Sequence, residues 1–150
     1  NENFAKIVEA HARNIDTRCM DFKNIREQNI PEGYSVLYSQ RALHYIRYEE
    51  AKTLLKTCFN RMANGGKAFL SVAGYDTEYG KIFPDRNKPV KDRFAMVTKD
   101  MQHKHGIKHP IVTYTENEFR MLLEDVGFTV ESIKASDFGN IKAISCKPKP

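Results

Sequence analysis

The clearest pattern of apolar and polar positions runs from residue 34 to residue 72. Residues 34–38 form a short apolar run rich in β-branched and aromatic side chains, which predicts a buried strand. From Ala51 to Met62 the apolar positions recur every three or four residues, which predicts one amphipathic helix. A second apolar run, from Lys67 to Val72, predicts a strand covered on both faces. Together these segments predict two parallel strands joined by a crossover helix.

Glycine marks the end of this helix in the sequence. Asn64, Gly65 and Gly66 follow the periodic segment directly. Since glycine accepts the left-handed conformation found at helix ends, we expect the helix to stop at these residues.

The pattern on either side is less regular. Residues 1–14 predict an amphipathic helix with Asn3 as its N-cap, and Ile15 to Phe22 predicts a short strand followed by a loop. Periodicity is lost over residues 73–112, which contain repeated glycine and proline. We expect this segment to be a long excursion with only short elements, of the kind that often covers or selects a substrate.

The last third of the chain predicts a helix and a hairpin. Thr115 and Glu118 have the spacing of a capping box, and Gly127 ends the helix that follows. Residues 128–133 and 141–146 predict two antiparallel strands joined by a turn. The whole chain therefore predicts a single α/β domain, with a mostly parallel sheet that ends in an antiparallel hairpin.

Composition narrows the class of protein. The 150 residues have the length of one domain, and no apolar run approaches the roughly 20 residues that span a bilayer. Without a signal-peptide pattern or paired cysteines, we expect a cytoplasmic protein without disulfides. The net charge of +5 favours an acidic partner, but the basic residues are spread along the chain, so a solvated surface explains them more simply.

Polar residues follow the first apolar strand directly. Ser39, Gln40 and Arg41 lie where open parallel sheets bind their ligands, beyond the carboxyl ends of the strands. The alternatives are a turn hydroxyl for Ser39, a solvated Arg41, and a His44 packed at the start of the helix.

Three histidines form a second candidate site. His103, His105 and His109 could supply imidazole ligands to a metal. No carboxylate or cysteine completes the set at the usual spacing, and lysines surround it, so the sequence favours a solvated basic loop and predicts no metal.

Two segments, residues 38–46 and residues 62–71, resemble the central part of class I S-adenosylmethionine-dependent methyltransferases. Within them the small-molecule branch that includes the tellurite-resistance type is the most similar. The resemblance implies a Rossmann-like sheet, S-adenosylmethionine as cofactor and methyl transfer (EC 2.1.1) to a small molecule. Many relatives carry an acidic residue at the position of Ser35, which this chain lacks.

The resemblance also implies roles for particular residues. Asp21 would bind the adenine amino group and the Phe22 backbone a ring nitrogen, although Asp21 also fits a helix cap. Ser39 would hold the amino-acid end of the cofactor. The other residues implied near the cofactor are Gln40, Leu43 and His44.

The acceptor would lie beside the long excursion. Tyr75, Asp76, Tyr79 and Phe83 have the aromatic and polar character of small-molecule pockets. If the acceptor must lose a proton, His44 or Tyr75 could act as the base.

Part of the family pattern is missing from the sequence. No glycine-rich G-x-G loop occurs, and nothing corresponds to the first strand, first helix and second strand of the family. We therefore expect a fragment of a longer protein, with an open sheet edge at the strand starting at Tyr34. Such an edge could also pair with a partner or exchange strands with a second copy, or the sheet could be rearranged.

Two other functions remain open at this stage. A methyltransferase-like scaffold would also lack the glycine loop. An RNA methyltransferase would suit the positive charge, but no aromatic stacking ladder is present, and residues 39–42 replace the N/D-P-P-Y/F type motif of base methyltransferases. Nucleic acid is therefore the less favoured partner.

Overall fold

A four-stranded mixed sheet organises the molecule, in the order β1-β2-β4-β3. The structure, a computed structural model, describes residues 18–150. Its strands are β1 (Tyr34–Gln40), β2 (Met62–Val72), β3 (Thr129–Ala135) and β4 (Ile141–Cys146). β1 and β2 are parallel, and β4 pairs antiparallel with both β2 and β3. The predicted parallel pair and C-terminal hairpin are both present, and the sheet over the described residues is mixed.

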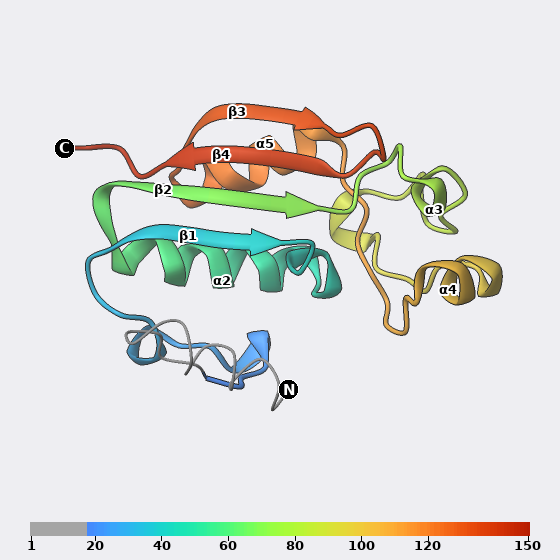
Figure 1. Ribbon diagram of the computed structural model, residues 1–150, viewed down its shortest axis with the longest axis horizontal. Coiled ribbons are helices and arrows are strands. Elements are labelled where there is room, and N and C mark those ends of the chain that lie inside the picture. Colours follow the sequence, from blue (N-terminus) through green and yellow to red (C-terminus); the bar gives the residue numbers. More distant parts are fainter. Residues whose placement is uncertain (1–17) are drawn as a thin grey trace, which may run out of the picture.

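Two helices cover one face of this sheet (Figure 1). Helix α2 (Tyr48–Arg61) connects β1 to β2, and α5 (Glu116–Val126) precedes β3. Both helices bury one apolar stripe, as their spacing predicted, and contribute to a single core with the strands. The buried stripes include Leu54, Leu55, Leu122 and Leu123.

The opposite face of the sheet is open over the described residues. Tyr38, Phe69 and Ile144 lie in one row across β1, β2 and β4, and their exposed fractions are 67%, 38% and 38%. Val36 on the edge strand β1 is 59% exposed. Among the strands of residues 18–150, β1 thus lies at the edge of the sheet, and its open face carries the apolar side chains of Val36 and Tyr38.

The predicted end of helix α2 at Asn64, Gly65 and Gly66 was wrong. The helix ends at Arg61, and β2 begins at the next residue, so Asn64, Gly65 and Gly66 lie within a strand. Gly65 adopts a left-handed φ of 79°, where the register between β1 and β2 shifts, and its N–H donates to the Lys147 carbonyl. A Cβ on Gly66 would lie 2.6 Å from the Met62 side chain. The glycines therefore form a bulge and a close contact.

The N-terminal segment is described from residue 18 onward. The helix predicted over residues 1–14 lies outside the described residues. The strand predicted from residue 15 to Phe22 is absent from residues 18–22, the part of it that the structure describes. Instead Phe22–Asn24 forms the short 3₁₀ helix η1, and Glu27–Asn29 forms η2.

Residues 73–112 contain only short elements and lie beyond the carboxyl ends of β1 and β2 (Figure 1). They comprise α3 (Glu78–Lys81), the 3₁₀ helix η4 (Val90–Asp92) and α4 (Lys99–His105). A small second core holds them together, built around Tyr79, Phe83 and Ile111.

The predicted capping box of α5 is confirmed, because Thr115 Oγ1 accepts from the Glu118 N–H and the Glu118 carboxylate accepts from the Thr115 N–H.

Candidate functional site

The carboxyl end of β1 has a constrained backbone. Arg41, the residue after the strand, has a φ of 51°, a left-handed conformation that is unfavourable for a residue with a Cβ. Its N–H donates to the Ser71 carbonyl at 3.0 Å and to Ser71 Oγ at 3.1 Å, at the end of β2. The surrounding strands therefore hold Arg41 in a strained conformation, a feature that gathers at binding and catalytic sites.

His44 lies just behind this turn, in the 3₁₀ helix η3 (Leu43–Tyr45). The side chain is 1% exposed, and its Nδ1 has no hydrogen-bond partner within the described chain. Burial, with a smaller contribution from the Arg41 charge, lowers the pKa of His44 to about 3. The imidazole is thus neutral at physiological pH.

Three further buried polar atoms lack partners among the described residues near the strand ends: Ser39 Oγ, the Tyr79 hydroxyl and Asn140 Oδ1. Tyr79 is 3% exposed. The Arg41 guanidinium and the Thr77 hydroxyl lie near its hydroxyl but are not placed for a well-formed hydrogen bond. Burial raises the pKa of Tyr79, and the positive charge of Arg41 opposes that rise. Buried polar groups without a partner cost free energy, so such a set indicates a place for a ligand.

A cavity of about 720 Å³ opens beside two of these residues, Tyr79 and Asn140. Arg41, Tyr79 and Asn140 line it together with residues of α3, α4 and the turn between β3 and β4. Its volume is that of a small-molecule pocket. The sequence placed Asp76, Tyr79 and Phe83 beside an acceptor pocket. Asp76 and Tyr79 line this cavity, whereas Phe83 is buried in the second core. The sequence did not indicate Asn140, because turn residues far apart in the chain meet there only after folding.

Some of the charged residues around the cavity form ion pairs within the described chain and others do not. The Glu78 carboxylate contacts Lys104 Nζ at 2.5 Å and His105 Nε2 at 3.1 Å, and these contacts lower the pKa of Glu78. Asp76, Lys81 and Asp137 are exposed on the lining. Among residues 18–150, no ion pair involves the Arg41 side chain.

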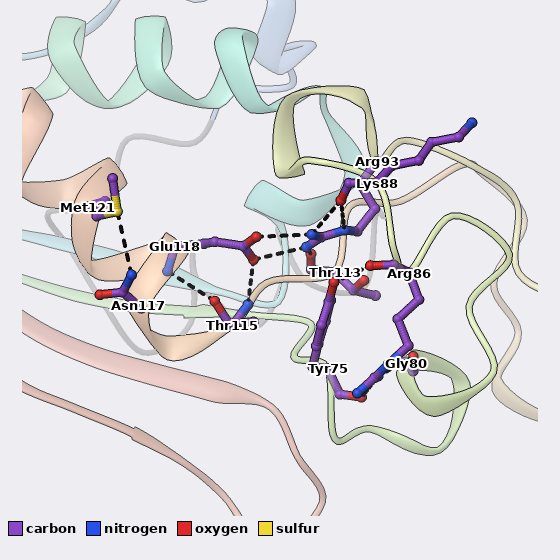
Figure 2. A network of polar contacts seen from close by, with 10 residues as sticks. All are labelled: Tyr75, Gly80, Arg86, Lys88, Arg93, Thr113, Thr115, Asn117, Glu118 and Met121. Atoms are coloured by element: carbon purple, nitrogen blue, oxygen red, sulfur yellow. Dashed lines mark hydrogen bonds and ion pairs between the residues drawn. The ribbon is translucent and has the colours of Figure 1, made fainter.

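Tyr75 lies in a different environment (Figure 2). Its ring has the Arg86 guanidinium 4.1 Å from its centroid and that of Arg93 at 4.6 Å. Its hydroxyl donates to the Arg86 carbonyl, and Arg86 Nη1 donates back to the Tyr75 carbonyl at 2.7 Å. The hydroxyl already has a partner, and Tyr75 does not line the 720 Å³ cavity.

Arg93 forms the centre of the network in Figure 2. Its side chain is 3% exposed and donates to both carboxylate oxygens of Glu118 at 2.9 Å. It also donates to the carbonyls of Thr113 and Lys88. Burial raises the pKa of Glu118, but the bonds from Arg93 and Thr115 outweigh it and lower the pKa. This network joins the long excursion to the start of α5.

The remaining predicted cofactor residues are dispersed. Asp21 Oδ1 accepts from the Lys23 N–H at 2.9 Å, so this side chain caps η1. Phe22 lines a groove beside α2 with Ile46, whereas Ser39 and Gln40 line a shallow groove on the open face of the sheet. Leu43 is buried in the main core.

No metal site occurs within residues 18–150, where no three His, Cys, Asp or Glu side chains are grouped to hold an ion. His105 instead contacts Glu78 and the Tyr79 ring. No helix in the same range is long and apolar enough to cross a bilayer.

Comparison with solved structures places this fold. A methyltransferase from Clostridium acetobutylicum ATCC 824 that depends on S-adenosylmethionine superposes with a TM-score of 0.69, at 12% identity, over 99% of this chain and 71% of that one. The S-adenosylmethionine-dependent methyltransferase SibL gives 0.65 at 17% identity, over 99% and 40% of the two chains.

A third similar structure is 1,6-didemethyltoxoflavin-N1-methyltransferase from Burkholderia thailandensis, solved with bound 1,6-didemethyltoxoflavin and S-adenosylhomocysteine. Its TM-score is 0.66 at 12% identity, over 97% of this chain and 56% of that one. No family model matches the sequence, and no curated protein matches it. The chain thus has the Rossmann-like fold of class I methyltransferases and spans less than two thirds of several of the structures it matches.

Proposed function

We propose that this chain takes part in methyl transfer from S-adenosylmethionine to a small-molecule acceptor (EC 2.1.1). The observation that supports it is a cavity beyond the carboxyl ends of β1 and β2, in a fold shared with methyltransferases. Its lining includes Tyr79 and Asn140, each with a buried polar atom that has no partner among residues 18–150. Ligands of open α/β sheets bind at this edge. We assign the chain to the small-molecule branch that includes the tellurite-resistance type.

The cofactor would lie along the end of β1. Ser39 Oγ, buried and without a partner among the described residues, fits the role of holding the amino-acid end of S-adenosylmethionine, with Gln40 and Leu43 beside it. Asp21 and Phe22 would meet the adenine, which requires Asp21 to exchange its capping bond for one to the base. The sulfonium supplies a reactive methyl group, so the chain's own residues mainly orient the acceptor and exclude water.

His44 is the better candidate for a base where the acceptor must lose a proton. Its imidazole is neutral at neutral pH, and Nδ1 has no partner within the described chain. With a pKa of about 3 it is a weak base, so this role requires that the bound acceptor raise that pKa. Tyr75, the other predicted base, has its hydroxyl bound to the Arg86 carbonyl and its ring between two guanidinium groups.

We further propose that additional polypeptide pairs with β1, either from further chain of a longer protein or from a second copy. β1 contains no charged residue and no proline, the features that usually protect an edge strand from pairing. The apolar row of Tyr38, Phe69 and Ile144 would be covered at the same time. The same row favours the second candidate function, a methyltransferase-like scaffold that binds a protein partner.

Calorimetric titration with S-adenosylhomocysteine tests the proposal. We expect micromolar binding that Ser39→Ala weakens by about 1 kcal/mol, the scale of one lost hydrogen bond, and that Asp21→Ala weakens similarly. Ser35→Ala, on the same strand, is the matched control and should bind like the wild type. A chain that is folded by circular dichroism but does not bind S-adenosylhomocysteine leaves two possibilities, a truncated enzyme or the scaffold. Titration of a chain extended upstream separates them, because only the enzyme gains binding.

A further inference from the structure

The cavity beside α3 holds a positive charge that the protein itself does not neutralise. Arg41 lies on its lining, and among residues 18–150 no carboxylate forms an ion pair with its guanidinium. The carboxylates that the structure describes on the same lining do not form ion pairs with Arg41. Glu78 is already paired with Lys104 and His105, and Asp76 and Asp137 are exposed.

The backbone at Arg41 supports a functional role. A left-handed conformation at a non-glycine residue costs about 1 kcal/mol or more. Glycine would relieve this cost, yet the strand ends here in arginine, with its N–H fixed by two bonds to Ser71. An exposed arginine needed only for solubility would not require this position.

The Tyr79 hydroxyl lies near the guanidinium, and Asn140 is on the same cavity lining. Both the hydroxyl and Asn140 Oδ1 are buried and have no hydrogen-bond partner in the described structure. Arg41 and the tyrosine hydroxyl can both donate to an anion, and the planar guanidinium fork matches a carboxylate in particular. The Asn140 oxygen requires a donor, which a polar hydrogen elsewhere on the ligand would supply.

We propose that this cavity binds an acceptor that carries a carboxylate-type anionic group, held by Arg41 and the Tyr79 hydroxyl. That the ligand is the methyl acceptor rests on the proposed function, whereas the anion preference rests on the cavity alone. Arg41 is then a specificity-determining residue, and the neutral His44 behind it is left free of the substrate's charge.

The test compares benzoate with its neutral analogue benzamide, titrated into the chain and followed by NMR chemical-shift changes. We expect benzoate to bind at least about tenfold tighter, as a charged hydrogen bond predicts, and Arg41→Gln to abolish that preference. Arg41→Lys should keep part of it. Lys108→Gln, which removes an exposed cation that does not line this cavity, should leave it unchanged.

Equal affinities for the two probes, no saturable benzoate binding, or a preference that survives in Arg41→Gln would each overturn the inference. S-adenosylhomocysteine is titrated into the same proteins. Cofactor binding without an anion preference leaves the proposed function standing and this inference overturned, and the reverse pattern does the opposite. If Arg41→Gln weakens S-adenosylhomocysteine as much as benzoate, Arg41 holds the cofactor's carboxylate and the inference is overturned.

Discussion

Two arginines, Arg93 and Arg41, show how differently this molecule treats a buried or constrained charge. Arg93 is almost fully buried and donates to Glu118, Thr113 and Lys88, so every part of its guanidinium has a partner. Arg41 is exposed, strained and faces a cavity whose nearest buried polar atoms also lack partners in the described chain. A satisfied polar network stabilises the fold, whereas an unsatisfied one costs stability and is retained for binding.

The largest expected effect comes from breaking the satisfied network. Arg93→Ala leaves the half-buried Glu118 carboxylate without its cation, and we expect it to lower the free energy of unfolding by about 3–5 kcal/mol. Urea denaturation measures this. Arg120→Ala, which removes an exposed pair with Glu124 at 3.7 Å, is the control and should cost less than about 0.5 kcal/mol. Equal losses of stability in the two variants would mean that the buried Arg93 network stabilises the fold no more than an exposed ion pair does.

The next effect concerns acid stability near the unsatisfied cluster. Unfolded His44 takes up a proton near its ordinary pKa of 6.5, but folded His44 only at about 3. The unfolded chain therefore binds more protons between these values, and stability falls as the pH falls below 6.5. Between pH 6.5 and 5 this contribution amounts to about 2 kcal/mol.

Urea denaturation at both pH values measures the loss for the wild type and for His44→Gln. We expect the variant to lose about 2 kcal/mol less than the wild type over this interval. His109→Gln, at an exposed histidine, should behave like the wild type. Identical slopes for His44→Gln and the wild type would mean that His44 protonates in the folded chain.

A matched pair of hydroxyl deletions sharpens the comparison further. Tyr75→Phe removes a hydroxyl that donates to the Arg86 carbonyl, and it should cost about 1 kcal/mol. Tyr79→Phe removes a buried hydroxyl without a partner in the described chain, so it should change stability by less than about 0.5 kcal/mol or raise it. Thermal denaturation ranks the two. The reverse order would show that Tyr79 is bonded in solution.

The smallest expected effect is at the strained residue itself. Arg41→Gly relieves the left-handed strain but gains freedom in the unfolded state, so stability should change by less than about 1 kcal/mol. The anion preference of the cavity should nevertheless disappear. Gln40→Gly, one residue earlier in an extended strand, should be the more destabilising of the two in the same thermal experiment.

Local signals predicted much of the fold. The apolar periodicity of α2 and the capping box of α5 are decided by neighbours in the chain, and both appear as predicted. Gly65 and Gly66 were misread, because a glycine stop and a glycine bulge share the same backbone freedom. What separates them is the Lys147 carbonyl, which reaches Gly65 from far along the chain.

The candidate site was less predictable for the same reason. The sequence indicated Ser39, Gln40 and Arg41 because they follow an apolar strand, and the family resemblance added His44. It gave no sign of the strain at Arg41 or of Asn140, since a φ angle and a turn brought across the sheet depend on tertiary contacts. The pairing of Arg93 with Glu118 spans 25 residues and could not be inferred from charge alone.

The position of β4 has a consequence for synthesis. β4 follows all the other described strands in the chain, yet it lies between β2 and β3. During translation, β2 therefore lacks its antiparallel neighbour until residues 141–146 have left the ribosome. Until then the unpaired strands are exposed and prone to aggregation. A ribosome paused before residue 141 would display an incomplete, chaperone-dependent sheet, so this protein should fold after translation of β4 and not progressively along the chain.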